Sequence, residues 1–438
     1  MIPSYLALFI VFAGSRWVTY VGLPPLFLTD VLLFSSTILG IIYSRTVPQN
    51  RGTATSGVLH YAVTIFTLYA CVRAVFSVQE NGVSIDLIRD FSPFLYIIVY
   101  FLARSTIAGK YGDGYGIFKF LKLSFLLHLI WVSFSVLSGN IFGFFQGSFL
   151  LSAGIFSVRP DFDSAMISVY VALLLVQLFE KFNIWDFIYL ALGIITVTSL
   201  QTRAGLISLL TCLFIAMLHL GKQGKLTLTW TYFLGTILVA FPTVFAFSPA
   251  VNRLLVSLGI FNDANAGFEA SSFGTITARN LVWQGVLDWT SSNDIRNLFG
   301  SGFGINFLVE SRTLIFLDDT QLNGVRSPHN WFLGIYARLG VFGFLLAALI
   351  FVMGLLIALR RIYADEFKDL NKLSALILGA LLPVALFGVV LESPFGAIPF
   401  YWALGIISSN SLSKIPIDSD KISKQKARKA PPKKESHK

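Results

Sequence analysis

The chain has 438 residues, of which 55% are hydrophobic and only 13% are charged. A soluble domain of ordinary composition has about 25% charged residues. About half that fraction, together with 42 phenylalanines, excludes an ordinary soluble protein and indicates that most of the chain lies in lipid. Lipid offers no partner to free backbone groups, so the spans must be helices or a closed barrel. The apolar runs are continuous rather than alternating, which favours helices.

Apolar runs long enough to cross a bilayer, about 20 residues each, recur along the chain. The amino terminus lacks the positive start and the small-residue cleavage site of a signal peptide, so we expect the first run to be retained. Cys71 and Cys212 both lie inside predicted spans and indicate neither a disulfide framework nor a metal site. The sequence predicts an all-α polytopic membrane protein with about 12 transmembrane helices, over residues 3–21, 24–43, 58–77, 84–103, 116–138, 162–180, 184–200, 203–220, 228–247, 330–359, 370–391 and 394–411.

The distribution of basic residues predicts the orientation of these helices. Lysines and arginines gather in one set of short loops and at the carboxy terminus, and such residues mark the cytoplasmic side. Both termini are then cytoplasmic, and the long polar loop at residues 248–329 is extracytoplasmic. We divide the chain into a transmembrane domain, residues 1–412, and a basic cytoplasmic tail, residues 413–438, with the composition of a disordered segment. These loops and the tail supply most of the net charge of +10, which therefore indicates no nucleic-acid partner.

The basic residues outside the cytoplasmic set differ from it in chemical type. All of them are arginines, and every lysine belongs to the cytoplasmic set. Orientation rules treat the two residue types alike, whereas the planar guanidinium binds phosphate or carboxylate through two hydrogen bonds and stays charged when partly buried. Tolerance of interfaces and internal ion pairs explains part of this bias, and for the rest we infer an anionic ligand at the extracytoplasmic face. The arginines concerned are Arg16, Arg73, Arg89, Arg159, Arg203, Arg253, Arg279, Arg296, Arg312, Arg326 and Arg338.

Two of these arginines have surroundings typical of anion binding. Arg203 stands at the expected start of the eighth span, where a helix amino terminus adds free N–H groups and positive potential. Arg279 and Trp283 share one face of a predicted amphipathic helix, residues 277–289, which we expect to lie on the extracytoplasmic surface. The alternatives are an arginine that reaches to the interface and a surface helix anchored by its tryptophans.

The end of the long loop holds a candidate base. His329 directly precedes the tenth span, and a histidine with a near-neutral pKa can accept a proton from an attacking hydroxyl. A structural role is the alternative for a lone histidine. Arg338, inside the same span, needs a buried partner, and we expect a structural ion pair with Glu392 or with Asp161 or Asp163.

Three ordered motifs within residues 200–345 resemble those of the O-antigen ligase and O-antigen polymerase superfamily of integral membrane glycosyltransferases. Their order, spacing and predicted sidedness agree with that family, whereas the first half of the chain matches only in its hydropathy layout. The motifs are the turn Thr202-Arg203-Ala204-Gly205 at the start of a span, Arg279-x-x-x-Trp283 with Gly302-Phe303-Gly304 in the long loop, and His329-Asn330 followed by Gly340-x-x-Gly343.

The resemblance implies a metal-independent, cofactor-free enzyme of the bacterial inner membrane with a GT-C-like lipid-diphosphate glycosyltransferase fold. Such enzymes take a glycan from an undecaprenyl-diphosphate carrier and join it to a sugar hydroxyl of the lipid A core or of another lipid-linked glycan. Carried over to this chain, Arg203 and Arg279 bind the diphosphate, and His329 is the base or positions the acceptor. We expect further substrate contacts, and no metal ligand, among Arg159, Trp283, Gly302, Gly304, Arg326 and Asn330.

Two alternatives remain open from the sequence. Some O-antigen polymerases carry a glycine at a fixed distance after an arginine in their outer loops, and its absence here favours the ligase layout without deciding it. The alternative class is a multi-pass transporter or flippase of lipid-linked oligosaccharide. Transporters place ionisable residues near the membrane midplane, often in repeated halves, and this chain shows no convincing internal repeat.

The substitution Arg279→Lys tests the diphosphate-binding role. We expect it to abolish most glycan transfer while the protein folds normally, because lysine keeps the charge but loses the two-pronged hydrogen bonding. Transfer is measured in membrane vesicles, with size-exclusion chromatography as the folding control. Activity close to that of the wild type would contradict the role.

Overall fold

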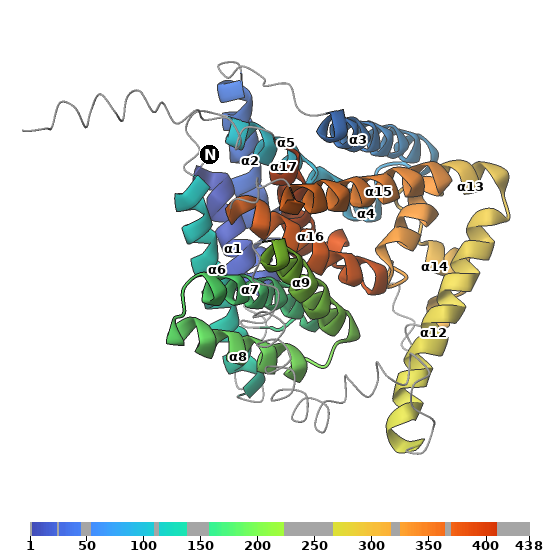
Figure 1. Cartoon of the computed structure of the whole chain (residues 1–438). Helices are drawn as coiled ribbons and strands as arrows, with labels where there is room; N and C mark the ends of the chain where they lie inside the picture. The colour runs from blue at the N-terminus through green and yellow to red at the C-terminus, as the bar shows by residue number, and fades with distance from the viewer. Residues whose placement is uncertain are drawn as a thin grey trace, which may run out of the picture.

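The computed structural model describes residues 2–23, 26–44, 54–108, 114–137, 157–222, 266–316, 325–363 and 369–409. This part of the chain is helical except for loops and one short antiparallel pair, β1 (Gly22–Leu23) with β2 (Leu26–Phe27) (Figure 1). The predicted span at residues 228–247 and the predicted tail at residues 413–438 lie outside the described residues.

The helices of the first half are α1 (Ile2–Thr19), α2 (Leu28–Ser44), α3 (Ala54–Asn81), α4 (Ile85–Leu95), α5 (Ile98–Ala108), α6 (Gly114–Leu137), α7 (Pro160–Glu180), α8 (Ile184–Ser199) and α9 (Arg203–Lys222). The second half holds α12 (Ala266–Ser291), α13 (Asp294–Phe299), α14 (Phe307–Glu310), the 3₁₀ turn η2 (Leu314–Phe316), α15 (Trp331–Tyr363), α16 (Asp369–Phe387), η3 (Val390–Glu392) and α17 (Pro394–Ser408).

The length and composition of these helices confirm a polytopic, all-helical membrane protein. Helices α3, α6, α7, α9, α15 and α16 are each long and apolar enough to cross a bilayer. Shorter apolar helices occupy the predicted first, second, seventh and last spans. Apolar side chains on the outer helices face away from the protein, as Leu68 of α3 does with 62% of its surface exposed, because lipid is as apolar a neighbour as another helix.

The centre of the molecule is formed by α7 and α16. In the apolar 18-residue stretch of each helix, 78% of the residues are buried inside the protein. Both helices pack against α9 (Figure 1). Ser208 of α9 donates to the carbonyl of Ala380 in α16 at 2.6 Å, which satisfies a hydroxyl within the packed interface. Helices α15 and α17 close the opposite side of α16.

The predicted fourth span, residues 84–103, is wrong as a single helix. The chain forms α4 and α5 instead, separated by a turn at Tyr96 and Ile97. Pro93, near the end of α4, has no N–H to donate to the preceding turn. Helix α4 is also amphipathic, with Leu87, Asp90 and Phe94 buried, so it is shaped to lie against the protein rather than to cross the bilayer alone.

Helix α15 is broken at Gly340, where φ is 68° and ψ is −169°. The break frees backbone carbonyls, and neighbouring groups satisfy them. Ser301 N–H donates to Ala337 O at 2.8 Å, Gly302 N–H donates to Arg338 O at 2.9 Å, and the Tyr69 hydroxyl donates to Leu339 O at 2.8 Å. The predicted span at residues 330–359 therefore consists of two helical segments joined where the 300–304 turn docks.

Gly340 is required both by its conformation and by close contact. A Cβ at this position would lie 2.3 Å from Leu298 O and 2.5 Å from the backbone nitrogen of Phe299. We therefore expect Gly340→Ala to lower the unfolding temperature in detergent, because a positive φ with ψ near 180° is open almost only to glycine and costs a residue with a side chain of order 1–3 kcal/mol. The control is Gly57→Ala in α3, where a Cβ has no neighbour within 4 Å. Equal unfolding temperatures for the two variants would contradict this account of the break.

Candidate functional site

The start of α7 contributes the first group of residues to the candidate site. Arg159 is the N-cap, Pro160 supplies the preset backbone angle of the first turn, and Asp161 and Asp163 complement the positive helix end. The Asp161 carboxylate accepts two hydrogen bonds from Arg159, from Nε at 2.8 Å and from Nη2 at 3.3 Å. The backbone N–H of Arg159 donates to Asp163 Oδ2 at 2.6 Å. The Arg159 guanidinium is thereby oriented, and its remaining donors are available to a ligand.

The start of α9 lies beside the start of α7. Thr202 Oγ1 accepts from Gly205 N–H at 3.2 Å and caps the helix. The same hydroxyl is 3.1 Å from Ser164 Oγ of α7. A Cβ on Gly205 would lie 2.1 Å from Ser164 Oγ, so only glycine permits this approach. The Thr-Arg-Ala-Gly turn thus brings Arg203 next to the amino-terminal end of α7.

Arg279 reaches the same region from α12. This helix confirms the predicted helix at residues 277–289 and extends further toward the amino terminus. The Arg279 Nη1 donates to Phe387 O, the last residue of α16, at 3.4 Å. A Cβ on the next residue, Gly388, would be 3.2 Å from Asp161 Oδ2. The end of α16 therefore lies between Arg279 and the Arg159–Asp161 pair.

His329 is electrostatically coupled to these groups. Burial lowers the pKa of its imidazole, the positive charges of Arg279 and Arg159 lower the pKa further, and Asp161 opposes them. Burial also lowers the pKa of Arg279, and Asp161 again opposes the shift. We call Arg159, Arg203 and Arg279 the arginine group. The groups that act on the His329 imidazole thus come from the start of α7 and from α12.

The backbone of His329 is in the left-handed region, with φ of 55°. A side chain in that conformation costs of order 1–3 kcal/mol, which persists only where the surroundings impose it. Its neighbours are held on both sides. Trp283 Nε1 donates to Pro328 O at 2.8 Å, and Asn330 Oδ1 caps α15 by accepting from Leu333 N–H at 3.1 Å. Trp283 and Asn330, predicted as substrate contacts, are therefore engaged in positioning His329.

Arg326 belongs to a buried ionic network rather than to the arginine group. Its Nε and Nη2 donate to the Asp90 carboxylate at 3.0 and 2.6 Å. Arg338 shares Asp90 at 3.5 Å and contacts Glu392 at 3.4 Å. The ion pair of Arg338 with Glu392 confirms one predicted partner, while Asp90 was not predicted. Because two carboxylates already occupy Arg326, with Asp86 at 3.2 Å as the second, we leave it out of the ligand site.

The glycine-rich turn also bonds to the protein. Gly302 N–H donates to Arg338 O, as described above, and Gly304 N–H donates to Asp90 Oδ2 at 3.1 Å. Between them the N–H of Phe303 donates to Ser77 Oγ at 2.9 Å, and the Phe303 ring is fully buried. The anion that this turn recognises in the structure is therefore the Asp90 carboxylate.

The structure thus brings together His329, Arg279 and Arg159 and packs the start of α9, which carries Arg203, against the start of α7. It engages Arg326, Gly302 and Gly304 in bonds within the protein instead. Sequence reasoning missed Asp161 as a member of the site. Its signal was the Arg-Pro-Asp sequence of a helix start, in which proline at the first helical position and acidic residues in the first turn are favoured. Among the described residues, no three histidine, cysteine, aspartate or glutamate side chains form a group suited to a metal ion.

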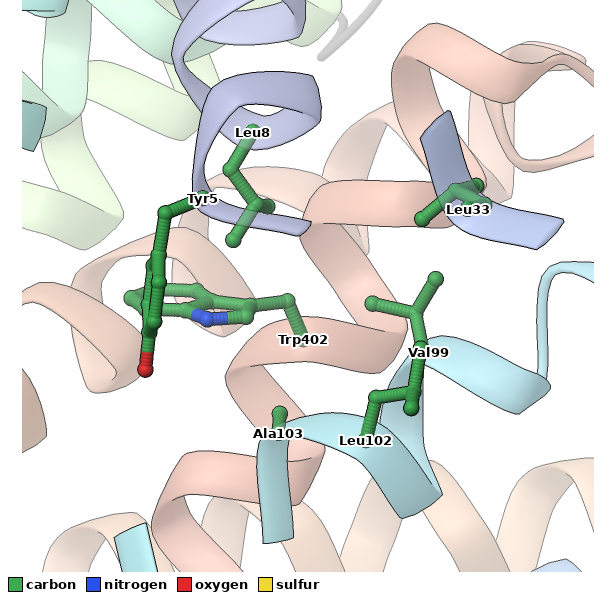
Figure 2. A pocket seen from close by; sticks show the side chains of 7 residues that line it. All are labelled: Tyr5, Leu8, Leu33, Val99, Leu102, Ala103 and Trp402. Carbon is green, nitrogen blue, oxygen red and sulfur yellow. The ribbon is translucent and has the colours of Figure 1, made fainter. Parts of the chain in front are cut away.

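A small pocket lies elsewhere, between α1, α2, α5 and α17 (Figure 2). Its lining holds no charged side chain and includes the rings of Tyr5 and Trp402, so it does not suit a diphosphate. The complete lining is Tyr5, Leu8, Leu33, Val99, Leu102, Ala103 and Trp402.

Comparison with known proteins agrees with the motifs. A family model described as O-antigen ligase matches residues 188–348, which include Arg203, Arg279 and His329. A search of curated proteins found no match. The family description indicates glycan transfer or polymerisation in the cell envelope. The match confirms that this chain, over residues 188–348, resembles the O-antigen ligase and O-antigen polymerase superfamily.

Proposed function

We propose that this protein transfers a glycan from an undecaprenyl-diphosphate carrier to a sugar hydroxyl at the outer face of the bacterial inner membrane. The observation that carries the proposal is the position of His329, a half-buried base beside Arg159 and Arg279. A diphosphate leaving group needs cationic hydrogen-bond donors, and an acceptor hydroxyl needs a proton acceptor. Both requirements are met by residues from different helices, with Arg159 at the start of α7, Arg279 within α12 and His329 just before α15.

In this proposal the arginine group binds the diphosphate. As the bond between the sugar anomeric carbon and the phosphate oxygen breaks, its electron pair leaves with the diphosphate. Guanidinium groups stabilise the developing charge through paired, charge-assisted hydrogen bonds. Asp161 accepts two hydrogen bonds from the Arg159 guanidinium. These bonds fix the orientation of Arg159 before the diphosphate binds.

His329 is the proposed general base. The acceptor oxygen forms the new bond to the anomeric carbon, and its proton passes to an imidazole nitrogen. A base must be unprotonated to do this. The lowered pKa of His329, caused by burial and by Arg279 and Arg159, keeps the imidazole neutral at neutral pH.

The proposal includes a membrane orientation and a fold. We propose about 12 spans in a GT-C-like arrangement, with both termini cytoplasmic and the arginine group extracytoplasmic. The lysines support this orientation. Lys181 and Lys222 lie at the ends of α7 and α9 opposite to Arg159 and Arg203. Lys122 donates to Gln177 and Lys372 donates to Glu180, both near that same end of α7.

Reconstitution in nanodiscs tests the reaction. The purified protein receives an undecaprenyl-diphosphate-linked repeat unit, alone and then with a lipid A core acceptor. A ladder of products from the donor alone identifies a polymerase, and a single transfer that needs the second acceptor identifies a ligase. We expect His329→Ala to lower the rate about 10²- to 10⁴-fold, the usual contribution of a general base. No product in either mixture, with the variant indistinguishable from wild type, would favour a transporter or flippase instead.

The pH dependence of kcat/KM tests the role of His329. Activity that needs the neutral imidazole falls as pH drops through its pKa, so we expect an acidic limb below the ordinary value of 6.5. Arg279→Gln removes a neighbouring positive charge, which raises the pKa of His329 and moves this limb to higher pH in the residual activity. Arg296→Gln is the control, because that guanidinium lies over the Trp289 ring at 3.9 Å instead. An acidic limb that stays in place in Arg279→Gln would contradict the assignment.

A further inference from the structure

Asp90 stands at the centre of the network that leads to His329. Its carboxylate accepts from three separate segments of the chain, which are the Gly302–Gly304 turn, the residue three positions before His329, and α15. The side chain of Asp90 is 3% exposed, and those of Arg326 and Arg338 are each 6% exposed. Asp90 is therefore the one carboxylate that both buried guanidinium groups share, with Asp86 as the second partner of Arg326 and Glu392 as the second partner of Arg338.

The network passes from Asp90 to His329 along the backbone. Arg338 Nη2 donates to Arg326 O at 3.0 Å, which fixes the first peptide of the segment. Ser327 Oγ donates to Glu392 Oε1 at 2.9 Å, and Trp283 holds Pro328. Arg326, Ser327 and Pro328 are thus each held by a hydrogen bond. The next residue is His329, whose backbone has a positive φ.

We propose that Asp90 is a positioning residue that holds His329 in its left-handed conformation beside the arginine group. The proposal rests on the function proposed above. Asp90 lies outside the arginine group, so it acts through Arg326 and Arg338. Loss of the carboxylate leaves Arg326 with the exposed Asp86 alone and Arg338 with Glu392 alone, and the segment from Arg326 to Pro328 loses its bond to α4. Because a displacement of about 1 Å can cost 10²-fold in rate, the effect is expected in the chemical step.

The test compares Asp90→Asn with Asp86→Asn. Both residues contact Arg326, but Asp86 is 53% exposed and its contact of 3.2 Å lies at the surface, where an ion pair contributes little. We expect Asp90→Asn to lower kcat about 10- to 100-fold while the KM for the lipid-linked donor stays within about twofold. Asp86→Asn should keep both constants near the wild-type values, and Asp90→Glu, which retains the charge, should recover part of kcat.

A second readout does not depend on activity. Diethyl pyrocarbonate modifies neutral, accessible imidazole, and peptide mass spectrometry gives the rate of modification at His329 itself. We expect this rate to change in Asp90→Asn and to stay unchanged in Asp86→Asn, with the other histidines as internal standards. This readout distinguishes failure of the proposed function from failure of the positioning role of Asp90. If His329→Ala is fully active, the proposed function fails, while the labelling still reports whether Asp90 positions the imidazole.

Two results would overturn the proposal. One is an Asp90→Asn protein with wild-type kcat and wild-type labelling of His329. The other is an equal loss of kcat in Asp90→Asn and Asp86→Asn, which would assign the effect to the charge of Arg326 alone. Should Asp90→Asn fail to fold, the double variant Asp90→Leu with Arg326→Met replaces the ion pair by apolar groups, a change that folded proteins often tolerate. Wild-type kcat and labelling in that variant would equally overturn it.

Discussion

The buried carboxylate of Asp90 is the interaction on which the candidate site depends most. Taking ions out of water is costly, and removing one partner of a buried pair typically costs about 3–5 kcal/mol because the other charge is left uncompensated. Here the arrangement joins α4, the Gly302–Gly304 turn, the segment before His329 and the broken helix α15. The same turn fills the break at Gly340 by donating to the carbonyls that the break frees. Ion pairing and helix geometry therefore position the same few residues.

His329 lies between two charge clusters of different composition. On one side, Arg326 and Arg338 are matched by Asp90, Asp86 and Glu392, so their guanidinium groups are occupied. On the other side, Asp161 accepts two hydrogen bonds from Arg159 and opposes the pKa shifts of Arg279 and His329. The first cluster is suited to rigidity, and the second is the one that we propose binds the diphosphate. The proposed reaction needs both, because a base must be held still while a diphosphate departs.

The proposed site rests on local signals in the sequence. Arg203, Arg279 and His329 were proposed because helix starts, amphipathic spacing and the family motifs can be read within short stretches of the chain. Arg338 with Glu392 followed from the rule that a buried cation needs a partner. Arg326, Gly302 and Gly304 were assigned to substrate because nothing local reveals Asp90, which is 236 residues from Arg326 in the chain. The single span expected at residues 84–103 failed for a related reason, since hydropathy does not register that α4 buries Asp90 in an ion pair with residues from distant segments.

The sequence by itself determined the membrane class, most of the helices and the bias toward arginine outside the lysine-containing loops. Each of these depends on composition or on spacings within one or two helical turns. Only the tertiary structure decided that Arg326 and Arg338 are paired with carboxylates. That decision depends on carboxylates brought from distant segments, and charge compensation acts through space at about 3 Å, without regard to order along the chain.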